Sequence, residues 1–203
     1  MRPQPPAELL EPVPEAFAPS DDLREWVTAT FIAEDGELTN PDHAHLADAA
    51  IGFLWTNVDN ARAMRVIAGQ AELMPPMAMG KWQRARAMQQ VTDWFGDLPD
   101  FLITIHAPIA ATMDDASFCA LVEHELYHCA QAVDRYGMPK FRDDGSPIFQ
   151  IRGHDVEEFV GVVARYGAEA AGVTAMVEAA ARRPLIGRAS IAGACGTCAL
   201  KAA

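Results

Sequence analysis

A short string near the middle of the chain, H-E-L-Y-H at residues 124–128, constrains this sequence more than any other feature. Apolar residues around it recur every three or four positions, the spacing of a helix with one buried face: Val122, Leu126, Cys129 and Val133. Residues four apart on a helix lie one above the other, so both imidazoles can reach one metal ion. Because the apolar stripe uses a neighbouring face, we expect His124, Glu125 and His128 to point toward a cleft.

A catalytic zinc site needs a third protein ligand and one position left for water. His154 is our first choice, because it is the only histidine downstream of the motif. An Asp-Asp-Gly-Ser turn at residues 143–146 predicts a hairpin that folds the chain back toward the metal. Glu157 and Glu158, in the first turn of a helix expected to start near Asp155, are the alternatives. Glu158 also fits an ordinary helix-capping position.

Charge and composition exclude several classes of protein. The chain has 203 residues and a formal net charge of −12, which disfavours nucleic acid and anionic membranes as partners. No apolar run approaches the roughly 20 residues of a membrane-spanning helix, and the N-terminus lacks the pattern of a secretory signal. We therefore expect a cytoplasmic protein in which four cysteines remain thiols: Cys119, Cys129, Cys195 and Cys198.

The chain divides into three stretches. Residues 1–20 contain six prolines and predict a loosely ordered lead-in. Residues 21–183 are expected to form one α+β domain, with a core at about 46–166. Within it we predict helices over 21–33, 81–95, from Asp115 or Ser117 to near Gly137, and over 169–182, and strands at 51–55, 64–71 and 101–105.

The last stretch, residues 184–203, carries a C-x-x-C pair formed by Cys195 and Cys198. It lacks the second pair of a four-ligand zinc site and the strand–helix setting of a redox motif. A structural or incidental role is the expectation, with a second metal site or redox chemistry as alternatives.

Two known families share these motifs. H-E-L-Y-H followed by G-H-D-V-E-E-F, residues 153–159, is similar to SprT-like and Spartan-like metalloproteases, whose second motif supplies the third zinc ligand. The stretch from about Leu46 to Phe159 resembles the phage metallopeptidase family, in the run I-G-F-L-W at 51–55, D-F-L-I-T-I at 100–105 and A-L-V-E-H-E-L at 120–126. The chain departs from the Spartan-like pattern in a longer spacing before His154 and in Asp155, where those proteins have glycine.

The resemblance implies a compact zincin-like fold of the minimal gluzincin or SprT-like type. A small mixed sheet packs on the active-site helix, followed by a β-hairpin and further helices. Zn²⁺ would be held by His124, His128 and His154, with Glu125 as general base in peptide-bond hydrolysis. A peptide would add to an edge strand, for which residues 101–105 are the candidate, although a buried core strand explains them equally well.

The sequence leaves the oxyanion-stabilising residue, the substrate and the competing functions open. The residue that stabilises the oxyanion is one of five candidates: Tyr127, Tyr136, Tyr166, Arg152 and His106. The substrate is an unknown protein or peptide of a phage or bacterial setting. A zinc-stabilised binding or structural protein with little turnover is the competing function, and hydrolysis of a non-peptide amide is a third.

Overall fold

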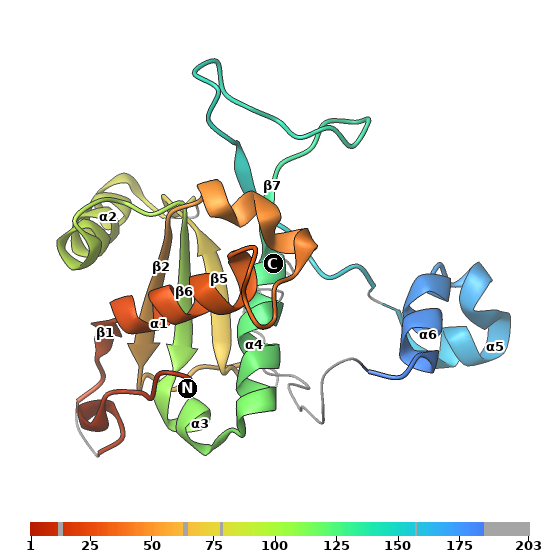
Figure 1. Cartoon of the computed structure of the whole chain (residues 1–203), viewed down its shortest axis with the longest axis horizontal. Coiled ribbons are helices and arrows are strands. Elements are labelled where there is room, and N and C mark those ends of the chain that lie inside the picture. The colour runs from red at the N-terminus through yellow and green to blue at the C-terminus, as the bar shows by residue number, and fades with distance from the viewer. Residues whose placement is uncertain (12–13, 63–64, 78, 157, 185–203) are drawn as a thin grey trace.

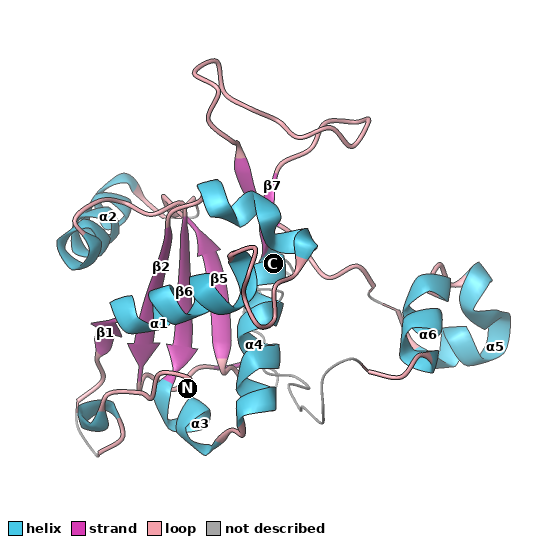
Figure 2. Ribbon diagram, viewed as in Figure 1, coloured by secondary structure: helices cyan, strands magenta, loops and turns pink. Residues whose placement is uncertain are grey.

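A four-stranded mixed sheet forms the centre of the molecule. The structure is a computed structural model that describes residues 1–11, 14–62, 65–77, 79–156 and 158–184. The strand order is β1 (Phe17–Pro19), β2 (Ile51–Thr56), β6 (Phe101–His106) and β5 (Gly69–Leu73) (Figures 1 and 2). β2 and β6 run parallel, while β1 and β5 are antiparallel to their neighbours. This arrangement confirms the predicted α+β class with a small mixed sheet.

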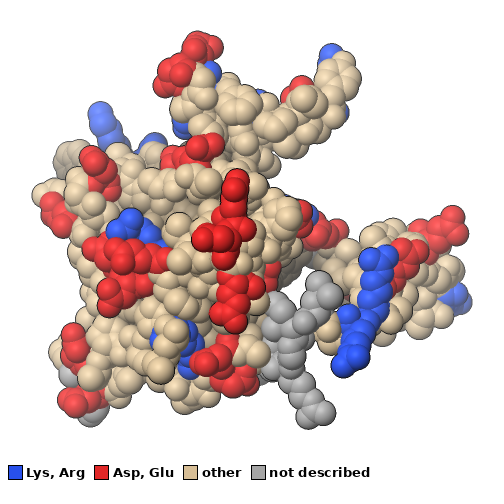
Figure 3. All heavy atoms as spheres, viewed as in Figure 1, with Lys and Arg blue, Asp and Glu red and all other residues tan. Residues whose placement is uncertain are grey.

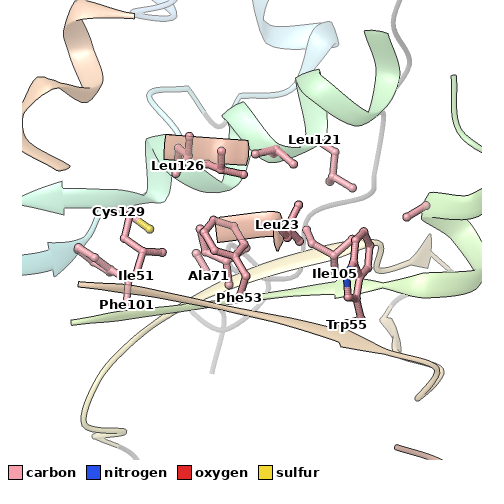
Figure 4. Close-up of a cluster of buried hydrophobic side chains, with 14 of the residues drawn as sticks. Leu23, Ile51, Phe53, Trp55, Ala71, Phe101, Ile105, Leu121, Leu126 and Cys129 are labelled. Atoms are coloured by element: carbon pink, nitrogen blue, oxygen red, sulfur yellow. The ribbon is translucent and has the colours of Figure 1, made fainter. Parts of the chain in front are cut away.

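The main core lies between this sheet and two helices, α1 (Asp21–Val27) and α4 (Asp115–His128). Alternate residues of the central strands face these helices, as the two-residue period of a strand requires. Figure 4 shows Leu23 of α1 and Leu121 and Leu126 of α4 meeting the sheet. Ser20 caps α1 by accepting the amide of Leu23 at 3.2 Å, and a single wide turn, η2 (Thr28–Ile32), extends the predicted first helix to residue 32.

The second face of the sheet is covered by α2 (Lys81–Phe95) at one end. Val91 packs there with Leu54 of β2, Leu102 of β6 and Met74. The other end of this face carries polar side chains on the same strands, and they line an open hollow: Thr56, Gln70, Glu72, Thr104 and His106. One face of the sheet is therefore wholly apolar and the other is half polar.

The proline-rich start of the chain is more ordered than predicted. It forms a short helical turn, η1 (Ala7–Leu9), and the strand β1, which pairs with β2. Proline is tolerated there because β1 is an edge strand, where a missing amide hydrogen can face outward. The expected boundary at residue 21 thus separates a strand from the sheet to which it belongs, although the domain limits themselves stay a prediction.

The helix that carries the H-E-L-Y-H motif ends earlier than predicted. It stops at His128, and residues 129–131 form β7 (Cys129–Gln131), which pairs with β8 (Phe149–Ile151). The predicted turn at 143–146 is present, with the amide of Arg142 donating to the carbonyl of Ser146 at 2.8 Å. Strand pairing supplies hydrogen bonds that a longer helix would otherwise have to make, and it leaves Val133 about half exposed, outside the buried stripe.

Two further predictions are wrong for topological reasons. The strand at residues 101–105 is not an edge strand, because β6 lies between β2 and β5. The strand expected over 64–71 lies instead at 69–73, after a small hairpin formed by β3 (Ala61–Arg62) and β4 (Arg65–Val66). The edge nearest α4 is therefore β5, which sequence patterns alone did not distinguish from its neighbours.

The C-terminal helices also differ from expectation. The helix predicted from Asp155 begins instead at Val160, as α5 (Val160–Ala170), and the helix expected over 169–182 is the shorter α6 (Thr174–Ala181). Gly172 adopts a φ of 69° between them, a conformation that glycine takes readily and that ends a helix. Phe159 and Val160 are about four-fifths exposed, and the two helices lie beside the main body (Figure 1).

Two short helical elements complete the described part of the chain: η3 (Pro41–Asp48) and α3 (Ala107–Thr112), just before α4. None of the helices in the described ranges is long and apolar enough to cross a membrane.

Candidate metal centre

The helix α4 positions the central motif. Asp114 caps its first turn by accepting the amide of Ser117 at 2.8 Å. Phe118, Val122 and Leu126 are fully buried against the sheet and α1. The helical period therefore directs His124 and His128 to another side, where both line a hollow of about 380 Å³.

Three histidines converge at this hollow. Nε2 of His124 lies 3.2 Å from Nε2 of His128 and 3.2 Å from Nε2 of His154. One ligand nitrogen from each residue lies within 4.8 Å of the others. In the described ranges this is the one group of three or more His, Cys, Asp or Glu residues with such spacing. The structure thus brings together the three residues expected to bind metal.

Strand pairing explains how His154 reaches the motif from 26 positions further along the chain. The β7–β8 register places Cys129 opposite Ile151, and the amide of Arg152 donates to the carbonyl of His128 at 2.9 Å. Nδ1 of His128 lies 2.6 Å from the carbonyl oxygen of Arg152 and donates to it. This bond fixes the ring orientation and turns Nε2 of His128 toward His124.

The electrostatic environment keeps His124 neutral. Burial, followed by the neighbouring His128 and His154, lowers the pKa of His124 to about 4. A histidine binds metal through an unprotonated ring nitrogen, so the imidazole of His124 is in its ligand form at neutral pH.

Glu125 lies deeper than predicted. It is fully buried and does not line the hollow that the histidines share. Its carboxyl group packs against the start of β5: a Cβ atom on Gly69 would fall 3.0 Å from Oε1 of Glu125. The expectation of a Glu125 side chain open to the cleft is therefore wrong, because β5 passes directly over it.

Glu158, one of the two alternative ligands, is not part of this group. Glu158 uses Oε1 to accept its neighbour's amide, that of Phe159, at 2.7 Å. Because the helix does not start at Asp155, its predicted capping role is absent. Glu157 lies outside the described residues, as do Cys195 and Cys198. Cys119 and Cys129 are free thiols, and burial holds the pKa of Cys129 well above its ordinary value.

The five residues considered as oxyanion-stabilising groups lie in different parts of the structure. Tyr127 and Arg152 line the hollow with the histidines. Tyr136 is exposed in the excursion between β7 and β8, and Tyr166 is exposed on α5. His106 lies on the other hollow, on the second face of the sheet.

The hydroxyl group of Tyr127 already has hydrogen-bond partners. It accepts a hydrogen bond from Nδ2 of Asn40 at 2.8 Å and donates to Oδ2 of Asp42 at 3.2 Å. Arg152 is half exposed and forms an ion pair with Asp155, three residues further along the same loop. Arg152 is thus the more available of the two hydrogen-bond donors.

A comparison with protein families decides the classification. The family described as "Putative phage metallopeptidase" matches residues 24–181, more than half of the chain. The chain belongs to this family. No curated protein and no solved structure matches it.

Placed in the phage metallopeptidase family, the chain has its three convergent histidines within the matched span. Sequence reasoning missed other residues of this site: Asn40 and Asp42, which hold Tyr127, Gly69, which borders Glu125, and Met176 of α6, which also lines the hollow. No local sequence pattern marks these residues, since each reaches the site through tertiary packing.

Proposed function

We propose that this phage metallopeptidase family member is a zinc-dependent peptidase, with His124, His128 and His154 as the metal ligands. The convergence of their three Nε2 atoms, 3.2 Å apart in two of the pairs, carries the proposal. Three imidazoles that leave a fourth position open are a typical ligand set for catalytic zinc. When bound, zinc acidifies water and polarises a carbonyl oxygen.

Glu125 is the proposed general base and acid. A carboxylate next to the first histidine can accept a proton from the attacking water and pass it to the leaving amine. Its burial against β5 shields it from bulk water. Arg152 is the proposed donor to the developing oxyanion, because it lines the same hollow and carries a permanent positive charge.

The proposed substrate is a peptide or a protein segment in extended form. In the described ranges no strand pairs with the outer edge of β5. An extended peptide could add there as a further strand, next to the segment of β5 that contacts Glu125. A net charge of −12 makes nucleic acid an unfavourable partner, and Figure 3 shows acidic groups spread over the viewed face of the main body. We propose the cytoplasm as the setting, where a reducing environment keeps thiols free.

Metal analysis of the purified protein tests the ligand set. We expect one zinc per chain in the wild type and loss of stoichiometric zinc in His124→Ala and in His154→Ala. Glu157→Ala is the matched comparison, because Glu157 is the alternative ligand. A wild type without stoichiometric zinc overturns the metal site. Zinc retained by His154→Ala but lost from Glu157→Ala overturns the assignment of the third ligand.

The burial of Glu125 also favours a second function, a zinc-stabilised binding or structural protein with little turnover. Glu125→Gln separates the two proposals, because the amide has the same shape but cannot act as a base. A peptidase would keep its zinc and lose hydrolysis of a mixed peptide library. If the wild type binds zinc but cleaves nothing in that library, the binding protein is the better description.

A further inference from the structure

A second hollow, of about 340 Å³, lies on the face of the sheet opposite the histidines. Its floor comes from β5 and β6, whose alternate residues Gln70, Glu72 and Thr104 project to this face. Asp59 and His106 lie at its far end. Among the described side chains no lysine or arginine lines it, whereas two carboxyl groups do.

Glu72 is the half-buried carboxyl group of this hollow. Burial raises the pKa of Glu72. Within the described ranges its carboxyl group forms no hydrogen bond or ion pair. A positively charged partner stabilises a desolvated carboxylate that has no neighbouring cation more than it stabilises a fully solvated carboxylate. The side chain is therefore poised to bind a positive charge that the rest of the described chain does not supply.

His106 gives an independent sign that the hollow receives a polar group. Its Nδ1 accepts the amide of Ile109 at 3.4 Å, which places the ring proton on Nε2. Nε2 is buried and lacks a hydrogen bond of good geometry within the described residues. Its nearest acidic neighbour is the exposed carboxyl group of Asp59, at 3.3 Å. Buried donors of this kind are normally satisfied, so polar contacts here remain to be completed.

The strand β5 borders both the hollow and the proposed active site. Gly69 lines the hollow and also borders Glu125. A peptide paired with the outer edge of β5 would place alternate side chains on opposite faces of the sheet. Residues opposite Gly69 and Ala71 would face α4, while residues opposite Gln70 and Glu72 would lie over the hollow. Directly opposed side chains on neighbouring strands have Cβ atoms about 5 Å apart.

We propose that this hollow is a specificity subsite for lysine or arginine side chains of a peptide laid along β5, with Glu72 as the residue that selects them. The inference rests on the proposed peptide-binding edge. It adds a substrate class, basic extended segments, to the proposed hydrolysis.

The experiment uses zinc-loaded, full-length protein and a set of fluorescent decapeptides, each with one lysine moved stepwise along an otherwise neutral sequence. Cleavage is measured with the wild type and equilibrium binding with Glu125→Gln. Glu72→Gln, made in both backgrounds, removes the charge without changing shape. Glu25→Gln is the matched control, because Glu25 is exposed on α1, away from the hollow.

We expect lysine to improve binding and kcat/KM by roughly fivefold, the upper range for an opposite-charge cross-strand pair. The gain should occur at one position, or at two positions separated by one residue, and disappear in Glu72→Gln but persist in Glu25→Gln. Gln70→Glu should add a preference two positions away. A preference that survives Glu72→Gln, or that is equal at consecutive positions, overturns the subsite.

Failure of the proposed function is distinguishable from failure of this inference. If no peptide is cleaved but Glu125→Gln binds lysine peptides in a Glu72-dependent way, the subsite stands and hydrolysis is wrong. If peptides are cleaved with no Glu72-dependent preference for lysine, the peptidase stands and the subsite is wrong.

Discussion

Gly69 lies against Glu125, the proposed general base, and leaves room for it because glycine has no side chain. A Cβ atom there would lie 3.0 Å from Oε1 of Glu125 and 3.1 Å from Cδ1 of Leu121. For Gly69→Ala we expect the Glu125 carboxyl group to shift, lowering kcat by about tenfold or more. Overpacking should also reduce the free energy of unfolding by about 1–3 kcal/mol.

The measurements for Gly69→Ala are steady-state kinetics, zinc content and a thermal melt. Zinc should remain at one per chain, because the histidines lie on other elements. A variant with unchanged kcat would show that Glu125 does not depend on this close approach.

The lowered pKa values of two histidines predict that the metal-free protein loses stability in acid. The pKa values of His124 and His43 are both lowered to about 4, chiefly by burial. The unfolded chain therefore binds more protons than the folded chain between pH 6.5 and 4, so stability is lost as the pH falls through this window. Denaturant unfolding of metal-free protein at pH 7 and pH 4.5 should show this loss.

His43→Leu provides the comparison for the pH experiment. His43 is buried beside the ring of Tyr127, with ring centroids 4.6 Å apart, and it is not one of the proposed ligands. Its removal should weaken the dependence of stability on pH. An identical slope in the variant would contradict the assigned role of His43 in acid sensitivity.

The convergence of the three histidines could be predicted from sequence, because the spacing of the first two follows from helix geometry. His124 and His128 require only one helical turn, and His154 requires only that the chain return. The placement of Glu125 could not be predicted, since it depends on which strand passes over α4. Its partner Gly69 lies 56 positions earlier in the chain.

At the level of elements, Arg2 near the N-terminus contacts the start of α4 and the segment before it. The guanidinium group of Arg2 donates to Oδ1 of Asp115 at 2.8 Å and to the carbonyls of Ala110 and Met113. It also lies over the ring of Phe118. We expect Arg2→Ala to reduce the free energy of unfolding by about 2 kcal/mol, the scale of hydrogen bonds to a charged group.

Chemical denaturation with Arg2→Lys as a second variant tests this role. Lysine keeps the charge but lacks the planar set of donors that reaches all three acceptors, so most of the loss should remain. Full stability in Arg2→Lys would mean that charge alone matters.

The excursion between β7 and β8 is expected to be dispensable for the metal site. The strands pair at residues 129–131 and 149–151, below the excursion. Replacing residues 133–147 by Asn-Gly, a favoured two-residue hairpin turn, should leave zinc binding intact. Zinc content and circular dichroism of this variant check the expectation. Loss of zinc from a folded variant would show that the excursion itself supports the site.

The ends and partners of elements were harder to predict than their existence. The apolar spacing through Val133 favoured a longer helix, but pairing of residues 129–131 with β8 ended it at His128. The apolar run at 101–105 indicated a strand without indicating its neighbours. Both errors concern long-range pairing, which competes with local preference and is not encoded in a short window.

On the scale of the whole molecule, the folded core does not include the C-terminal helices. The buried residues of the main cluster lie between Leu9 and Phe149, and no residue of α5 or α6 is buried. A chain ending at Phe159 should therefore unfold within a few degrees of the full-length protein, since surface changes usually cost less than about 0.5 kcal/mol. Thermal melts of both forms test this, and a large fall would assign the helices to the core.

The parallel pairing of β2 with β6 has a kinetic consequence. Ile51 lies beside Phe101, so the central pair of strands closes a loop of fifty residues. Closing such a loop costs entropy before any contact compensates for it, and folds rich in distant contacts form slowly. β5 lies inside that loop in sequence but attaches to the outer side of β6 in space. β5 pairs with β6 across a shorter separation, 28 positions from Leu73 to Phe101, so the edge that covers Glu125 is expected to form before the parallel pair closes the centre of the sheet.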